Sequence, residues 1–199
     1  TVTIVGSGLS LAEGIPGMGE LAKKLQMEIP GLLSATGDIK NWNNIENDLA
    51  KGVGLEEALH NTKPSSYVEE CIRKVTAIYI GEADKRLLTD IVKTGKQLRF
   101  SEYLQRFNIR NEGMTVITTN YDRLLEYACE TNEIMADTLF VGKYIARFKP
   151  NQSKYASCIG VQRTNGKGKK LQYSPRVIIL KPHGCLSWHL INSIPYSLP

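Results

Sequence analysis

The chain opens with a short run of β-branched and apolar residues, Thr1–Val5. A run of this length and kind predicts a buried β-strand. It leads directly into the glycine-rich segment Gly6–Ser10, which we interpret as a loop. Beyond the loop, apolar side chains recur at the spacing of one helix face: Leu21, Leu25 and Ile29. Pro30-Gly31 ends this helix, so the sequence predicts a first unit of strand, glycine loop and helix.

Helical periodicity dominates residues 38–112. Apolar residues at helical spacing predict one helix around residues 42–49 and a second from Tyr67 to about Ile80. Further helices are predicted around residues 87–92 and, as a short segment, over Ser101–Phe107. We interpret the whole region as a helical insertion between the first and second strands.

A second strand is predicted at Met114–Thr119, because β-branched residues occupy most of its positions. A helix follows through Leu124–Ala128, and Asp122 is placed to cap its N-terminus. Arg176–Lys181 predicts a third strand, which Pro182-His183-Gly184 ends. Since strands alternate with helical segments, this order favours an α/β fold with a parallel sheet and helices outside it.

Residues 138–175 show no clear period, and Thr164–Lys170 is predicted to be an exposed turn or a hairpin tip. The same part of the chain concentrates positive charge. All 20 acidic residues precede residue 138, whereas residues 138–199 contain ten Lys or Arg and no acid. A block this one-sided favours an anionic partner, such as a nucleotide phosphate, a nucleic acid or an acidic protein surface. A solvated basic loop is the alternative, and we give it equal weight.

The length of 199 residues favours a single domain. We expect residues 1–199 to form it, with the helical insertion at about 38–112 and a basic insertion at about 138–175. Hydrophobic residues make up 42% and charged residues 23%, which excludes a fibrous or wholly disordered chain. No apolar run approaches the roughly 18–20 residues that a membrane span needs. Because the chain starts at Thr1 without a methionine, we expect it to be part of a longer protein.

The four cysteines are widely spaced along the chain: Cys71, Cys129, Cys158 and Cys185. No Cys-x-x-Cys pair occurs, so local spacing provides no zinc ribbon, and we predict no metal site. Two of the cysteines fall in predicted amphipathic helices, where we expect them to be buried packing residues. This usage fits the reducing cytoplasm better than secretion.

Polar chemistry follows each of the three predicted strands: Gly6–Ser10 after the first, Asn120 after the second and His183 after the third. If the strands are parallel, these segments meet at one sheet edge, which is where ligands bind in such folds. Glycines let a backbone approach phosphate closely, an asparagine amide both donates and accepts, and an imidazole titrates near neutral pH. Each segment alone has a structural explanation, as a tight turn, a turn asparagine or a packed histidine. Their convergence favours a site.

These segments resemble motifs of the sirtuin superfamily. Gly6–Ser10 followed by Gly14-Ile15-Pro16 is similar to its first nucleotide-binding motif, residues 118–122 to its Asn-x-Asp motif, and His183-Gly184 to its catalytic His-Gly. The resemblance implies a Rossmann-like NAD-binding fold in which Asn120 and His183 are the catalytic residues beside the nicotinamide ribose. It implies NAD-binding roles for six further residues: Gly6, Ser7, Gly8, Ser10, Thr119 and Asp122. For Asp122 we favour the helix cap over a direct contact.

Departures from the deacylase sirtuins indicate the subtype. Their zinc ribbon is missing, Gly17-Met18-Gly19 replaces their Asp-Phe-Arg, and Thr119 replaces a glutamine. In these respects the chain resembles bacterial sirtuin-like effectors of anti-phage defence, which hydrolyse NAD. That resemblance implies NAD as substrate, no metal, a cytoplasmic location and a homo-oligomer. It also implies a fused sensor domain or a HerA-type ATPase as partner.

The sequence therefore predicts an NAD glycohydrolase, which releases nicotinamide and ADP-ribose. Three alternatives remain open. A protein deacylase would need an acyl-lysine cleft, which the missing zinc module disfavours. A module that senses NAD or ADP-ribose without turnover would not need both Asn120 and His183. A nucleic-acid-binding domain would use the basic residues 138–181, where Tyr144, Phe148 and Tyr155 interleave with lysine and arginine.

Overall fold

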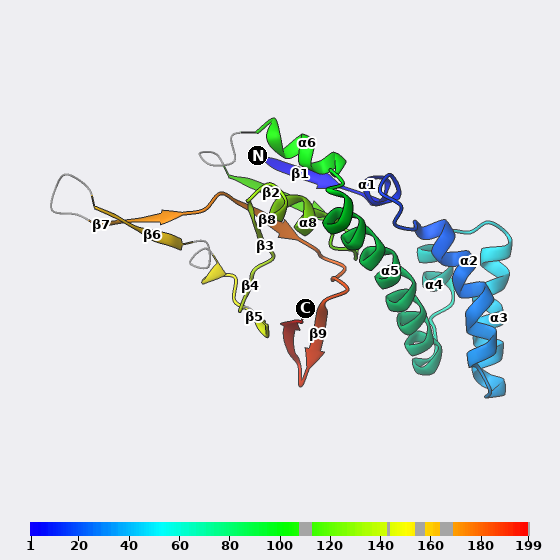
Figure 1. Cartoon of the computed structure of the whole chain (residues 1–199). Coiled ribbons are helices and arrows are strands. Elements are labelled where there is room, and N and C mark those ends of the chain that lie inside the picture. Colours follow the sequence, from blue (N-terminus) through cyan, green and yellow to red (C-terminus); the bar gives the residue numbers. More distant parts are fainter. Residues whose placement is uncertain (108–112, 143, 154–157, 164–168, 199) are drawn as a thin grey trace. The chain divides into compact units, whose positions relative to one another are not determined.

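A computed structural model describes residues 1–107, 113–142, 144–153, 158–163 and 169–198 (Figure 1). The chain divides into two compact units. One combines Thr1–Leu9 with Asp90–Pro199, and the other is Ser10–Thr89. The prediction of a single domain with two insertions stays a prediction.

A four-stranded parallel sheet forms the centre of the first unit. Its order is β1 (Val2–Val5), β2 (Met114–Thr118), β8 (Arg176–Leu180) and β3 (Met135–Asp137), and each neighbouring pair is parallel. β2 and β8 alternate between buried and half-buried side chains, because both lie inside the sheet and place alternate residues in the core. The predicted α/β class with a Rossmann-like parallel sheet flanked by helices is confirmed.

Two short helices of this unit pack close to the sheet. α8 (Leu124–Glu130) contacts β3 and β8, and α6 (Arg99–Gln105) contacts α8. α8 buries five of its seven residues: Leu124, Leu125, Tyr127, Ala128 and Cys129. Such a short helix gains its stability from burial, since its length is too small for independent helix formation.

The segment after β1 corrects one prediction. We expected Gly6–Ser10 to be a loop, but α1 (Ser7–Leu11) begins directly after Gly6. The Gly6 carbonyl accepts the Leu9 N–H at 3.2 Å and so starts the first turn. Glycine and serine are poor helix formers, which is why the pattern alone did not indicate a helix.

The basic part of the chain folds into short antiparallel strands that the sequence did not reveal. One sheet has the order β4 (Phe140–Val141), β5 (Ala146–Phe148), β10 (Ile194–Ser197) and β9 (Trp188–Ile191). A separate hairpin pairs β6 (Cys158–Arg163) with β7 (Lys169–Tyr173). Most of the predicted tip, residues 164–168, lies outside the described residues.

The second unit is helical. It contains α2 (Met18–Glu28), the 3₁₀ helix η1 (Ile29–Leu32), α3 (Thr36–Ala50), α4 (Leu55–Asn61) and α5 (Ser66–Thr94), whose end runs into the first unit. Its core joins all five elements through a cluster that includes Leu25, Ile29, Trp42, Ile45, Ala58 and Val68.

Two helix predictions in this unit were incomplete. The expected helices at 67–80 and 87–92 form one continuous helix, α5, because Gly81 between them is tolerated without a break. α4 was missed, since only Leu55 and Ala58 of its seven residues are buried and so short a segment shows no periodicity. Among the described helices, the 29-residue α5 included, none has the length and apolar character to cross a membrane.

Candidate functional site

The ends of three parallel strands bring the predicted site segments to one edge of the sheet. Val5 is opposite Thr118 across β1 and β2, and Ile117 is opposite Leu180 across β2 and β8. The chain therefore leaves these strands at nearly the same level, in the same direction. This is the geometry in which open α/β sheets bind ligands.

Asn120 connects the second of these segments to the first. Its side-chain Nδ2 donates to the carbonyl oxygen of Gly6 at 3.1 Å. Its backbone N–H donates to Oγ1 of Thr118 at 3.1 Å, which fixes the turn that leaves β2. The Asn120 side chain thus lies against Gly6, although these two residues are 114 positions apart.

The glycine turn, by which we mean Gly6 and the first two residues of α1, Ser7 and Gly8, is exposed to solvent. Gly6, Ser7 and Gly8 are exposed, and a Cβ added at either glycine would meet no atom within 4 Å among the described residues. Neither glycine has a positive φ. Backbone conformation and internal packing therefore do not require glycine here, whereas a ligand that approaches the bare backbone would.

The remaining members of the predicted NAD-binding set differ in exposure. Thr119 is exposed, whereas Asp122 is 4% exposed, and its Oδ1 accepts the Leu124 N–H at 3.1 Å. This bond satisfies the N–H of the first residue of α8, but Arg123 occupies the N-cap position, so the prediction that Asp122 is the N-cap residue is wrong by one position. Ser10 is also 4% exposed and belongs to the helical unit. The roles of all these residues toward NAD stay predictions.

His183 lies in a tight turn that follows β8. The Gly184 N–H donates to the Lys181 carbonyl at 3.0 Å and closes the turn. Gly184 has φ of +94°, a conformation that glycine adopts without strain, and this explains why glycine follows the histidine. His183 itself is exposed.

One backbone hydrogen bond joins the histidine turn to the asparagine loop. The Leu186 N–H donates to the Tyr121 carbonyl at 3.0 Å. Hydrogen bonds consequently connect the three predicted segments one after another. Asn120 binds the Gly6 carbonyl, and the loop that contains Asn120 binds the chain just after His183.

A buried ion pair, which was not predicted from the sequence, connects the end of β8 with α8. Lys181 is 4% exposed, and its Nζ lies 2.9 Å from Oε1 of Glu126 in α8. The same ammonium donates to the Asp122 carbonyl. A lysine that ends an otherwise apolar strand indicates a buried cation, but it does not identify the partner of that cation.

Three of the four cysteines behave as packing residues, whereas Cys158 in β6 is exposed. Cys71, Cys129 and Cys185 are buried thiols. Burial, together with Glu126 and Glu130, raises the pKa of Cys129 to about 12, so this thiol stays protonated near neutral pH. No group of three or more metal-binding side chains occurs among the described residues.

Part of the predicted basic region is engaged internally. Arg176 forms an ion pair with Asp137, with Nη1 and Oδ2 2.7 Å apart, and Lys181 pairs with Glu126. Arg147 lies over the ring of Tyr196, with 5.5 Å from its guanidinium carbon to the ring centroid. Asp137 and Glu126 offset the charges of Arg176 and Lys181, which leaves a smaller net charge for an anionic partner.

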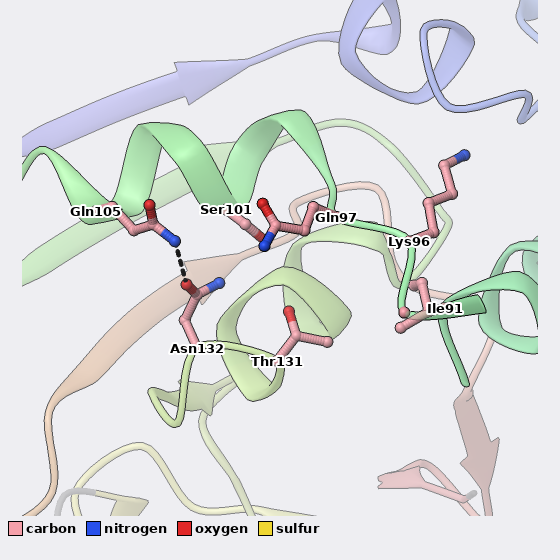
Figure 2. A pocket seen from close by; sticks show the side chains of 8 residues that line it. Ile91, Lys96, Gln97, Ser101, Gln105, Thr131 and Asn132 are labelled. Atoms are coloured by element: carbon pink, nitrogen blue, oxygen red, sulfur yellow. Dashed lines mark hydrogen bonds between the residues drawn. The ribbon is translucent and has the colours of Figure 1, made fainter. Parts of the chain in front are cut away.

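The first unit has two pockets of note. One, of about 380 Å³, is formed by β1, the glycine turn and α6, and its lining includes Gly6, Gly8 and Arg99. The other, of about 240 Å³, lies between α6 and the end of α8 (Figure 2). Gln105 of α6 donates to Asn132 across its mouth at 3.1 Å. No residue of the predicted NAD site lines this second pocket.

Comparison with known proteins supports the sirtuin-like resemblance. Residues 114–197 match the family model described as SIR2-like domain. The match spans less than half of the 199 residues and contains Thr119, Asn120, Asp122 and His183, but not the glycine turn. It associates the chain with NAD-related activity in general. No curated protein matches the chain.

Proposed function

We propose that this chain is an NAD glycohydrolase, which cleaves the bond between nicotinamide and ribose. The bond from C1′ of the ribose to the pyridinium nitrogen breaks, and its electron pair leaves with nicotinamide. A water oxygen forms the new bond to C1′ and gives up a proton. Because the pyridinium is already cationic, the leaving group needs no acid.

The observation that carries this proposal is the hydrogen bond from Asn120 to the carbonyl of Gly6. It supports a site in which an amide lies beside a bare glycine backbone at the carboxyl edge of the sheet. We assign to Gly6, Ser7 and Gly8 the pyrophosphate and adjoining ribose, since their exposed backbone accepts close approach. Thr119 and Asp122, which belong to the same unit, complete the proposed surroundings.

Two side chains would do the chemistry. Asn120 would hold the water or a ribose hydroxyl, since an asparagine amide can both donate and accept hydrogen bonds. His183 would take a proton from that hydroxyl or water, a role typically worth about 10²–10⁴-fold in rate. Its exposure at the end of β8 supports access to substrate.

The resemblance to defence effectors extends the proposal to the cell. We propose that NAD depletion in infected bacteria is the biological role, carried out in the cytoplasm by a homo-oligomer. The trigger would come from a fused sensor domain or from a HerA-type ATPase partner.

The experiment is an incubation of the full natural protein with NAD, following nicotinamide and ADP-ribose with and without an acetylated peptide. We expect release of nicotinamide without peptide, lost in Asn120→Ala and His183→Ala. His189→Ala is the matched control, since His189 is exposed in β9 and has no proposed role. Release that depends strictly on the peptide would replace the proposal with a deacylase. NAD binding without any turnover, with or without the ATPase partner, would replace it with a sensor.

A further inference from the structure

Lys181 occupies an unusual place for a lysine. It follows β8 directly, precedes His183 by two positions and is 4% exposed. A buried ammonium is unfavourable unless its charge is paired and its protons are hydrogen-bonded. Its contacts therefore indicate what the surrounding structure requires of it.

Each contact of this ammonium joins a different part of the site. Nζ lies 2.9 Å from Oε1 and 3.1 Å from Oε2 of Glu126, in the first turn of α8. It donates to the Asp122 carbonyl, two residues after Asn120. It also lies 3.6 Å from Sγ of Cys185, two residues after His183. One charged group thus contacts the asparagine loop, the helix that follows that loop and the histidine segment.

The charge on Lys181 is permanent near neutral pH. Burial lowers the pKa of its ammonium, but the carboxylate of Glu126, with smaller effects from Cys185 and Asp122, more than reverses this and leaves the pKa raised. The contacts to the two loops are accordingly maintained by a cation rather than by a neutral amine.

We propose that Lys181, with Glu126 as its counter-ion, is a positioning residue that sets the spacing between the Asn120 loop and the His183 turn. This inference rests on the proposed function, because it assigns Lys181 a role in arranging that same site. Lys181 touches neither substrate nor reacting atoms in this role. Lys181 would act on the positions of Asn120 and His183 through its hydrogen bond to the Asp122 carbonyl and its contact with Cys185.

Stability alone is a poor explanation for the pair. Buried ion pairs are often no more stable than apolar residues of similar volume, because desolvation offsets their attraction. What an apolar pair cannot supply is a donor for the Asp122 carbonyl, which lies in a buried loop residue. The distinction between positioning and stability is therefore open to experiment.

The same strand offers a matched control. Arg176 at the start of β8 pairs with Asp137, whose side chain is 1% exposed, at 2.7 Å. The two ion pairs are about 16 Å apart along the strand, at about 3.3 Å per residue. Near each ion pair, one backbone amide donates a hydrogen bond whose protection from exchange can be measured. Near Lys181 the Leu186 N–H donates to the Tyr121 carbonyl, and near Arg176 the Met135 N–H donates to the Pro175 carbonyl.

Steady-state kinetics of the full natural protein are the first test, with folded fraction measured for every variant. We expect Lys181→Met to lower kcat for NAD about a hundred-fold, as small displacements of catalytic groups do, with KM within about threefold because the glycine turn is unaltered. Lys181→Arg, which keeps the charge, should restore part of kcat. The double variant Lys181→Met/Glu126→Leu removes the unpaired carboxylate and should regain thermal stability without regaining kcat.

Amide hydrogen exchange is the second test and needs no turnover. Lys181→Met should lose protection at Leu186 and keep it at Met135, whereas Asp137→Asn should do the reverse. The inference is overturned if Leu186 stays protected in Lys181→Met, if the apolar double variant recovers kcat, or if Asp137→Asn lowers kcat equally. A wild-type protein without NAD cleavage would refute the proposed function, while the exchange data would still decide whether Lys181 holds the two loops.

Discussion

Nδ2 of Asn120 donates to the carbonyl oxygen of Gly6 over 3.1 Å, between residues 114 positions apart. The same carbonyl accepts the Leu9 N–H that begins α1. One oxygen therefore accepts hydrogen bonds from both the first helix and the Asn120 amide. These bonds join two segments that the parallel pairing of β1 with β2 brings to one edge of the sheet.

Replacing Asn120 with aspartate should abolish NAD cleavage while the fold persists. The carboxylate would place an acceptor against the Gly6 carbonyl, so the hydrogen bond would be lost and the two oxygens would repel each other. Because one hydrogen bond contributes about 1 kcal/mol, we expect the free energy of unfolding to fall by about that amount. Nicotinamide release and chemical denaturation measure the two effects. Normal turnover in a folded Asn120→Asp protein would contradict the role of the amide.

Gly8→Ala should separate stability from substrate binding. Alanine is favoured over glycine in a helix by up to about 1 kcal/mol, and its Cβ would meet no described atom, so stability should be unchanged or raised. The KM for NAD should rise about tenfold, equivalent to about 1.4 kcal/mol, because the methyl group occupies space that the pyrophosphate needs. Gly19→Ala in α2 is the control, since it too has open space and no proposed contact with NAD. An unchanged KM in Gly8→Ala would show that the turn does not contact substrate.

The sequence predicted the three strands that carry the site, because β1, β2 and β8 are runs of mostly β-branched and apolar residues. The prediction that β1 is buried was wrong, since β1 lies at the edge of the sheet with Val2 and Ile4 exposed. β3 escaped prediction, since a three-residue strand shows no period and gains its place from pairing with β8. The two shortest antiparallel strands, β4 and β5, were missed for the same reason. β4 and β5 are two and three residues long. β5 pairs with β10, whose residues lie about 50 positions away, and β4 pairs with β5.

Candidate residues were easier to predict than their connections. Asn120 and His183 follow strands, so their place at the sheet edge could be inferred from parallel pairing. The ion pair of Lys181 could not be inferred from the sequence, because Glu126 lies 55 positions earlier and only the packing of α8 on β8 brings the two side chains together. The helix that begins at Ser7 was not predicted, because glycine has a low helix propensity. It forms nonetheless, and the Gly6 carbonyl accepts the Leu9 N–H in its first turn.

Ser101→Ala should stabilise the protein. Ser101 is 4% exposed in α6, and its hydroxyl has no hydrogen-bond partner among the described residues. Removing a buried unpaired hydroxyl should raise the free energy of unfolding by about 1 kcal/mol. Ser153→Ala should have the opposite sign, because that buried hydroxyl donates to the Pro150 carbonyl at 3.1 Å. A loss of stability in Ser101→Ala would show that solvent or a ligand in the adjacent pocket satisfies the hydroxyl (Figure 2).

Cys129 should make the folded state sensitive to alkaline pH. Burial raises its pKa from 9.0 to about 12, so the unfolded chain loses this proton first. A raised pKa contributes stability that is complete below pH 9 and is lost progressively between pH 9 and 12. At pH 10.5 the loss is about 2 kcal/mol, at 1.36 kcal/mol per pH unit. Cys129→Val, which keeps an apolar side chain of similar size, should show a shallower decline in the free energy of unfolding across this range. Parallel declines in the two proteins, measured by urea denaturation from pH 8 to 10.5, would contradict the assignment.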